Sequence, residues 1–224
     1  MSASTGVVSG VKASSMAGST SVVFVVDDDI SVRESLELLI AQAGWRPELF
    51  ASAREFLSCP PPGGASCLIL DVNLPDLNGL DLQKRIAADY YGMPIIFITG
   101  YGDIPMTVRA MKAGAVEFLQ KPYPTEVLLS AVRSALERSR AIVDEQAGLE
   151  LLRKRHQSLT PREKDVMAWV VRGQLNKQVG GELGISEITV KAHRGQVMRK
   201  MHAKSLAELV NMARRLGIQT AGND

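Results

Sequence analysis

The sequence predicts two domains of different class: a doubly wound α/β domain on a five-stranded parallel sheet, and a separate all-α domain of four helices joined to it by a long linker helix. Between residues 21 and 140, short apolar runs alternate with segments of helical periodicity, which is typical of a parallel sheet covered on both faces. Beyond residue 140 only helical spacing continues. The charge changes there too: residues 20–140 carry 15 acids and 11 bases, residues 141–224 carry 9 acids and 14 bases.

The composition of the 224-residue chain excludes several classes of protein. Hydrophobic residues make up 46% and charged residues 22%, which is ordinary for a globular protein and unlike a disordered or fibrous one. No apolar window approaches the roughly 18 residues of a membrane span, so no membrane partner is expected. Two cysteines are too few for a disulfide framework and suit a reducing cytoplasm, where we expect the protein. Residues 1–20 predict a disordered tail, and residues 219–224 a short second tail.

The pattern of the first domain gives its elements in chain order. A proline in the second apolar run, Pro47, favours an edge strand, because proline cannot donate a hydrogen bond to a neighbouring strand. We expect strands over residues 22–26, 45–50, 67–70, 94–98 and 115–119, and helices over 31–43, 53–57, 80–88 and 105–113, with a fifth helix from Thr125.

Polar residues follow four of these strands at the point where each strand ends. Three aspartates at 27–29 follow the first strand, Asp71 ends the third, Thr99 ends the fourth and Lys121 follows the fifth. Because the carboxyl ends of parallel strands meet at one edge of the sheet, we expect these groups to converge. Carboxylates so close together repel one another, and a hard divalent cation relieves that repulsion. Mg²⁺ fits, because it is held by few carboxylates and keeps several waters.

Residues 21–140 resemble the receiver domain of bacterial two-component response regulators, in particular the FixJ and StyR branch of that family. The motifs that carry the resemblance are Val-Val-Asp-Asp-Asp at 25–29, Leu-Asp-Val-Asn-Leu-Pro-Asp-Leu-Asn-Gly at 70–79, Ile-Thr-Gly-Tyr-Gly-Asp at 98–103, Lys-Pro at 121–122, and the stretch 104–115.

The resemblance implies a role for each polar residue of the sheet edge. Asp71 is the phosphoacceptor and takes a phosphoryl group from a histidine of a sensor kinase. The polar residues of the sheet edge bind either Mg²⁺, for which Mn²⁺ can substitute, or the phosphoryl oxygens. The metal ligands implied are Asp28, Asp71, the backbone carbonyl of Asn73 and, through water, Asp27; the residues that hold phosphoryl oxygens are Thr99 and Lys121. The bond Lys121–Pro122 is expected to be cis, and Asp76 is expected to be a loop acid rather than a ligand.

A receiver-like domain also implies a switch and a dimer. On phosphorylation Thr99 moves toward the new oxygens, and Phe118 rotates into the space behind it. The surface affected lies on the helix 105–113 and the strand 115–119. We expect the phosphorylated chain to form a homodimer through that face, with contacts from Val108, Arg109, Met111, Lys112 and Glu117.

The fifth helix continues well past the expected end of the first domain, to about Leu152. One set of its heptad positions turns polar, so a strong coiled coil is not supported. We expect a helix packed on the first domain and then a semi-rigid linker helix over residues 141–155, which Gly148 is placed to interrupt.

Residues 141–224, which carry more bases than acids, contain residue patterns typical of helix ends. Thr-Pro-Arg-Glu at 160–163 combines an N-cap, a first-turn proline and a capping box. A tight turn, Gly-Ile-Ser at 184–186, stands between two helices of which the second is cationic, the pattern of a DNA-binding helix-turn-helix. We expect helices from Thr160 to about 172, from a capping Asn176 to 183, over 187–201 after a capping Ser186, and from a second capping box, Ser205 with Glu208, to 216–217.

Residues 156–218 resemble the LuxR or NarL type of output domain. The matching motifs are Leu-Thr-Pro-Arg-Glu at 159–163, Asn-Lys-Gln-Val at 176–179, Gly-Ile-Ser at 184–186, Thr-Val-Lys-Ala-His-Arg at 189–194 and Met-Arg-Lys-Met at 198–201. Gly180, Gly181 and Gly195 depart from the family's pattern. The resemblance implies DNA base contacts from Lys191, Ala192 and Arg194, backbone contacts from Lys177, His193 and Lys200, and further contacts from Glu187 and Thr189.

These features predict a phosphorylation-activated transcription factor rather than an enzyme. Its expected partners are a sensor histidine kinase, double-stranded promoter DNA, RNA polymerase and a second copy of the chain. Two alternatives stay open. A magnesium phosphatase of the haloacid dehalogenase type uses similar residues but needs a second aspartate two residues after its nucleophile, where this chain has Asn73. A DNA-binding regulator that needs no phosphorylation would leave the acidic cluster unexplained.

Overall fold

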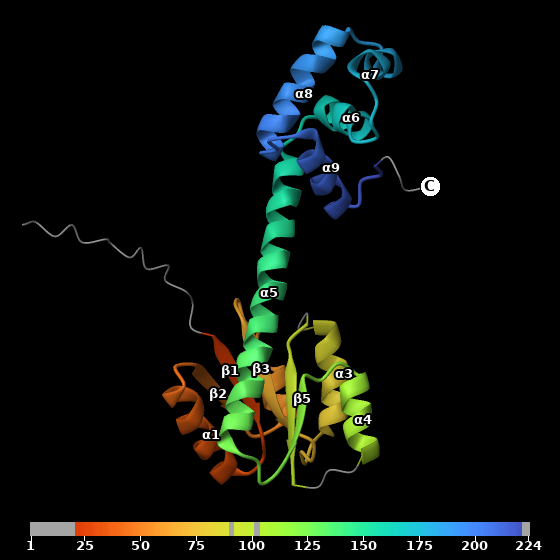
Figure 1. The fold of residues 1–224 in the computed structure, drawn as a ribbon. Helices are drawn as coiled ribbons and strands as arrows, with labels where there is room; N and C mark the ends of the chain where they lie inside the picture. The colour runs from red at the N-terminus through yellow and green to blue at the C-terminus, as the bar shows by residue number, and fades with distance from the viewer. Residues whose placement is uncertain (1–20, 90–91, 101–103, 221–224) are drawn as a thin grey trace, which may run out of the picture. The chain divides into compact units, whose positions relative to one another are not determined.

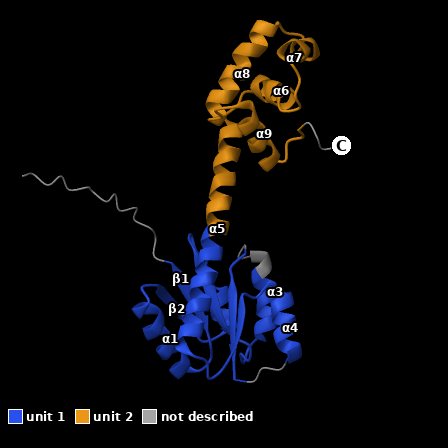
Figure 2. Cartoon of the chain, in the orientation of Figure 1, with its two compact units in different colours: residues 1–140 blue, residues 141–224 orange. Residues whose placement is uncertain are grey.

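The computed structural model describes residues 21–89, 92–100 and 104–220 (Figure 1). The chain divides into two compact units, Met1–Arg140 and Ala141–Asp224, drawn in blue and orange in Figure 2. The tail predicted for residues 1–20 lies outside the described residues, and so does most of the tail predicted for 219–224. No helix in the described part of the chain is long and apolar enough to cross a membrane.

The first unit is a doubly wound α/β domain, as the alternating strand and helix patterns predict. Its five parallel strands stand in the order β2-β1-β3-β4-β5, which puts the proline-containing β2 at an edge as expected. The strands are β1 (Val22–Val26), β2 (Arg46–Phe50), β3 (Ser66–Asp71), β4 (Ile95–Thr99) and β5 (Glu117–Gln120); the helices are α1 (Ile30–Gln42), α2 (Ala53–Leu57), α3 (Gly79–Asp89), α4 (Ile104–Lys112) and α5 (Thr125–Gln157).

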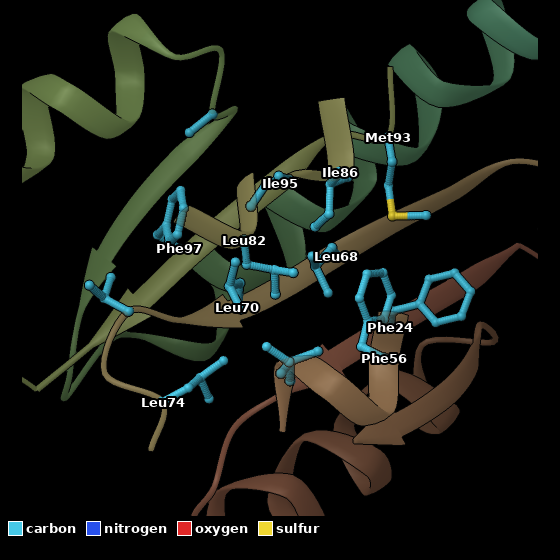
Figure 3. Packing of buried hydrophobic residues seen from close by; sticks show 14 of the residues in the cluster. Phe24, Phe56, Leu68, Leu70, Leu74, Leu82, Ile86, Met93, Ile95 and Phe97 are labelled. Atoms are coloured by element: carbon cyan, nitrogen blue, oxygen red, sulfur yellow. The ribbon is translucent and has the colours of Figure 1, made fainter. Parts of the chain in front are cut away.

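Each face of the sheet has its own hydrophobic core. Successive strand residues point to opposite faces, so Phe24 and Leu68 belong to one core and Val23 to the other. In the first core the strands pack against α2, α3 and α4, and the rings of Phe24 and Phe56 meet edge to face with centroids 5.6 Å apart (Figure 3). In the second core they pack against α1 and α5. Burial on both faces explains why the strands are continuous apolar runs.

The prediction that Gly148 interrupts the fifth helix is wrong. α5 runs unbroken from Thr125 to Gln157 and passes through both units. A single glycine inside a helix costs about 1 kcal/mol, which its helix-forming neighbours can offset. Within the second unit, Leu152 of α5 is buried in the hydrophobic core, and this packing adds to the stability of the helix end.

The last strand begins two residues later than the sequence pattern predicts. Gly114 adopts a left-handed conformation at φ 94°, and the N–H of Ala115 donates to the carbonyl of Ala110 in the last turn of α4. Ala115 therefore completes the helix end, and pairing with β4 starts with Val116, whose N–H donates to Ile95. The helix C-cap takes precedence over the β propensity of the apolar residues that follow it.

The second unit contains the four predicted helices after α5. They are α6 (Pro161–Val170), α7 (Asn176–Leu183), α8 (Glu187–Met201) and α9 (Leu206–Arg215). Their core includes the fully buried Val166, Val190 and Leu209. Thr160 and Glu163 form the expected capping box, and Ser186 caps α8 by accepting a hydrogen bond from the N–H of Thr189.

Two helix caps differ from the sequence prediction. Asn176 is not a cap: Leu175 is the N-cap residue of α7, and the side chain of Asn176 instead accepts a hydrogen bond from Arg194. Ser205 caps α9, but the second capping box is incomplete, because the carboxylate of Glu208 accepts from the N–H of Lys204 and not from that of Ser205. In both cases a neighbour outside the sequence motif takes the hydrogen bond.

Candidate functional site

One edge of the sheet carries a cluster of three carboxylates. Asp27 follows β1 and Asp71 ends β3, and a carboxylate oxygen from each, together with one from Asp28, lie within 4.8 Å of one another. Asp27 is fully buried and Asp71 nearly so, whereas Asp28 is exposed. Burial strengthens the repulsion between these groups, so the cluster needs positive charge close to it.

Lys121 supplies one positive charge from the far side of the cluster. Its Nζ donates to Oδ2 of Asp27 at 2.7 Å and to Oδ2 of Asp71 at 2.9 Å, and the bond to Pro122 that follows is cis, as the resemblance implies. Burial raises the pKa of Asp27, and the hydrogen bond from Lys121 offsets only part of that effect. Burial alone would lower the pKa of Lys121, but its hydrogen bonds to Asp27 and Asp71 outweigh burial and raise it.

Two further residues of the predicted site lie beside Asp71. The N–H of Asn73 donates to Oδ1 of Asp71 at 3.0 Å, and its side-chain amide reaches Oγ1 of the fully buried Thr99 at 3.4 Å. Phe118 is half-buried on β5, where its ring centroid lies 6.1 Å from that of Phe97. The hydroxyl of Thr99, the ammonium of Lys121 and the three carboxylates therefore lie at the same edge of the sheet.

The donor atoms of this cluster fit a metal ion. Asp27, Asp28 and Asp71 offer only oxygen, the donor type that hard divalent cations prefer. The exposed Asp28 leaves one side of the cluster open to solvent, and ions such as Mg²⁺ keep several waters when bound. The residues of the cluster therefore fit a hard divalent metal ion.

A second candidate site lies on helix α8. Val190, Val197 and Met201 are buried and turn one face of the helix toward the core. Among the predicted DNA contacts, Glu187, Lys191 and Ala192 on α8 and Lys177 on α7 are exposed. His193 is half-buried; Thr189 is exposed, and its hydroxyl lies 2.8 Å from that of the capping Ser186.

Two cations among the predicted DNA contacts also have partners in the domain. Nη1 of Arg194 donates to Oδ1 of Asn176 at 3.2 Å, which links α8 to α7. Nζ of Lys200 donates to Oε2 of Glu163 at 2.6 Å and to the carbonyl of Ser158 at 3.4 Å, which links α8 to the start of α6. These cations hold the helices together, and their contribution to DNA binding stays a prediction.

The predicted dimer face lies on α4 and β5. Val108 and Met111 are 44% and 43% exposed. Arg109 and Lys112 of α4 are also exposed, while Glu117 is half-buried and its carboxylate accepts from the N–H of Phe118.

Known protein families match both units. Residues 23–133 match the family described as "Response regulator receiver domain", and residues 157–213 match "Bacterial regulatory proteins, luxR family". "Nodulation protein W" of Bradyrhizobium diazoefficiens is 52% identical over 202 residues, which cover 90% of this chain and 89% of that protein. The chain belongs to the response regulators with a LuxR-type output domain. The resemblance found in its motifs is therefore confirmed.

Other response regulators support the assignment. "Transcriptional regulatory protein FixJ" of Bradyrhizobium diazoefficiens is 39% identical over 88% of this chain and 96% of that protein. The structure of "Response Regulator StyR" is 45% identical, covers 88% of this chain and all of that one, and superposes with a TM-score of 0.79. A receiver domain with a LuxR-type domain implies a sensor kinase and promoter DNA as partners. This is a family of transcriptional regulators and not of enzymes, so the phosphatase alternative is excluded.

Two contacts of the receiver domain have no counterpart in the sequence predictions. Asp76 is a loop acid, as expected, and its carboxylate accepts from the backbone N–H groups of Ala53 at 3.2 Å and Arg54 at 2.9 Å, at the start of α2. Arg33 donates to the carbonyl of Asp27 at 2.6 Å. Asp76 thus ties the loop after the phosphoacceptor strand to α2. Neither contact leaves a signal in the sequence, because both partners lie in other elements.

Gly79 has a steric role next to Asp71. A Cβ at this position would lie 2.6 Å from the carbonyl oxygen of Asp71 and 3.0 Å from the Cα of Val72. The N–H of Gly79 donates to the carbonyl of Val72 at 2.9 Å, which closes the loop. Only glycine allows α3 to begin this close to the end of β3.

Proposed function

We propose that this response regulator is activated by phosphorylation of Asp71. An oxygen of the Asp71 carboxylate attacks the phosphorus of a phosphohistidine on the sensor kinase, the P–N bond breaks, and the histidine nitrogen leaves with the electron pair. The observation that carries the proposal is the cluster itself: Asp71 stands at a strand end beside the exposed Asp28, with Lys121 Nζ at 2.9 Å. An acyl phosphate formed there is labile, which suits a signal that decays.

The residues around Asp71 would each bind or orient a part of the reacting group. Lys121 and Thr99 hold the phosphoryl oxygens, and Asp28 and the carbonyl of Asn73 join Asp71 as ligands of Mg²⁺ or Mn²⁺, with Asp27 acting through water. The bound cation would offset the charge that develops on the transferring phosphoryl group. Lys121 must loosen one of its two carboxylate contacts as it turns toward the new oxygens.

Phosphorylation would increase DNA affinity by inducing a dimer. Thr99 moves toward the phosphoryl oxygens, and Phe118 fills the space that it leaves. The exposed face of α4 and β5 then pairs with the same face of a second chain through Val108, Arg109, Met111, Lys112 and Glu117. Two LuxR-type domains on one DNA raise avidity without any change in either α8. Half-sites about one helical turn apart, ~34 Å, fit such a dimer.

In the LuxR-type domain we propose that α8 enters the major groove. Lys191, Ala192 and Arg194 meet base edges, with Glu187 and Thr189 beside them. Lys177, His193 and Lys200 contact the DNA backbone. Lys200 does so while it keeps its ion pair with Glu163. The bound dimer then recruits RNA polymerase to activate transcription. Because the proposed partner is promoter DNA, we expect the protein to act in the bacterial cytoplasm.

The decisive experiment replaces the phosphoacceptor. Asp71→Asn should incorporate no phosphate from acetyl phosphate with Mg²⁺, because the amide is not a nucleophile toward phosphorus, and should gain no DNA affinity on that treatment. Phosphate-affinity electrophoresis and a DNA gel shift measure the two effects. Asp81→Asn is the matched control, because Asp81 is a surface acid paired only with Lys84 among the described contacts. Phosphate incorporation by Asp71→Asn at the wild-type rate would reject the assignment.

A further inference from the structure

An isoleucine stands fully in solvent on the helix that is placed to bind DNA. Ile188, in the first turn of α8, is 82% exposed. Single exposed apolar side chains are common on proteins and carry no meaning by themselves. The position of Ile188 is more informative than its exposure, because it lies on the turn that follows the Gly-Ile-Ser turn of the helix-turn-helix.

Ile188 faces away from the core of its domain. The buried Val190 is two residues further on, which on a helix corresponds to nearly the opposite side. Residues three, four and seven positions after Ile188 share its side of the helix, and these are Lys191, Ala192 and Gly195, all exposed. Over residues 188–195 the outward face of α8 therefore presents one cation, Lys191, beside an apolar strip of decreasing side-chain size.

This face has few polar groups with which to read bases. The hydroxyl of Thr189 lies 2.8 Å from that of Ser186, and Arg194 donates to Asn176, so each of them must share or leave that partner to contact a base. Ala192 and Gly195 offer no polar side-chain atom, and a Cβ on Gly195 would meet nothing within 4 Å. Small residues let the helix backbone approach a groove closely, and a close approach brings Ile188 within reach of the base edges.

Thymine is the base that an isolated apolar side chain distinguishes. In the major groove it alone presents a 5-methyl group, and apolar contacts with that methyl are an established form of direct readout. The surroundings also fit DNA, because residues 141–224 carry 14 bases against 9 acids. We propose that Ile188 is a specificity-determining residue that selects thymine at one position of each half-site by packing against its 5-methyl group. The proposal rests on the binding of DNA through α8.

The test removes the methyl group from the DNA and the isoleucine from the protein. The full-length wild-type chain first selects its binding site from a random DNA pool. Each thymine of that site is then replaced in turn, at the equivalent position of both half-sites, by deoxyuridine, which lacks only the 5-methyl group. At one such position the wild-type affinity should fall about fourfold for each half-site, the equivalent of burying one methyl group at ~0.8 kcal/mol. Ile188→Ala should bind the thymine site more weakly by the same total factor, and should lose nothing further on the site with deoxyuridine in both half-sites.

Ile188→Val is the matched control, because it keeps a β-branched side chain and should retain most of the preference for thymine. Equal losses for Ile188→Ala on the thymine and deoxyuridine sites, at every position, would overturn the proposal, since the side chain would then contact the sugar-phosphate backbone. A variant that binds every DNA like the wild type but fails to activate transcription would also overturn it and would assign Ile188 to a protein partner. Failure of the wild type to select any sequence would reject sequence-specific DNA binding through α8 and the proposal with it.

Discussion

The acidic cluster of the receiver domain and the outward face of α8 are held in place in opposite ways. Lys121 meets Asp27 and Asp71 across 94 and 50 residues of sequence, and all three groups are buried or partly buried at strand ends. The α8 face comes from a single helix of 15 residues, and its members Ile188, Lys191, Ala192 and Gly195 are all exposed. The cluster therefore depends on the whole sheet, whereas the α8 face depends on one helix and its cap. Substitutions should separate the two regions.

The largest effect is expected from Lys121→Ala. Without its ammonium group the carboxylates of Asp27 and Asp71 lose the cation that donates to both of them, and the transferring phosphoryl group loses a charge-assisted hydrogen bond. Removal of one such electrostatic contact slows catalysis by about 100-fold or more. Phosphate incorporation from acetyl phosphate should fall by that factor, while basal DNA affinity stays at the wild-type level.

Lys84→Ala is the control for Lys121→Ala, because Lys84 is a surface lysine whose ion pair with Asp81 lies on α3. It should change neither rate nor affinity. Equal phosphorylation rates for Lys121→Ala and wild type would mean that Lys121 only neutralises the cluster in the unphosphorylated state.

A pair of glycine substitutions contrasts the two domains by their packing. Gly79→Ala places a Cβ 2.6 Å from the carbonyl of Asp71, so it should destabilise the receiver domain by about 2 kcal/mol and slow phosphorylation. Gly181→Ala in α7 meets nothing within 4 Å and should stabilise the LuxR-type domain by about 1 kcal/mol. Urea unfolding measures both changes. Unchanged stability in Gly79→Ala would show that α3 can move away from the strand end.

The same contrast explains what the sequence could predict. The five-stranded parallel sheet, the edge position of β2 and the convergence of Asp27, Asp71 and Lys121 follow from apolar runs and the parallel connection of strands. The cap made by Asp76 and the pair of Lys200 with Glu163 could not be predicted, because each joins elements that the pattern treats as independent. The predicted break at Gly148 is wrong for a related reason. Packing of the end of α5 in the core of the second unit outweighs the low helix propensity of glycine.

Two lysines of the LuxR-type domain should separate base reading from backbone binding. Lys191→Ala should weaken binding to the selected site about tenfold and to random DNA much less, because base contacts specify the sequence. Lys177→Ala should weaken binding about threefold on all DNAs and reduce the slope of log affinity against log salt by about one. Titrations on both DNAs at several salt concentrations measure this. Equal losses on all sequences for both variants would contradict the division of roles.

The smallest effect concerns the stability of the LuxR-type domain at low pH. The pKa of Glu163 is lowered, mainly by the hydrogen bond that its carboxylate accepts from Lys200. The hydrogen bond from the N–H of Thr160 lowers this pKa further. A carboxyl group whose pKa is lower in the folded than in the unfolded state stabilises the fold above the unfolded pKa of about 4.3. That stability is lost as the pH falls through the lower, folded pKa. Wild type should therefore lose stability below about pH 4.3 through this group.

Glu163→Gln keeps the shape of the capping box but removes the charge. Near neutral pH it should cost about 1 kcal/mol, because Lys200 loses its charged acceptor. As the pH falls below about 4.3, the difference in stability from wild type should shrink, since wild type is then protonated as well. Of the chain's two tryptophans only Trp169 lies in this domain, so a Trp45→Phe background makes its fluorescence a specific probe of unfolding. A difference that stays constant from pH 7 to pH 3 would show that Glu163 acts by packing alone, and that the ion pair with Lys200 contributes nothing to the domain.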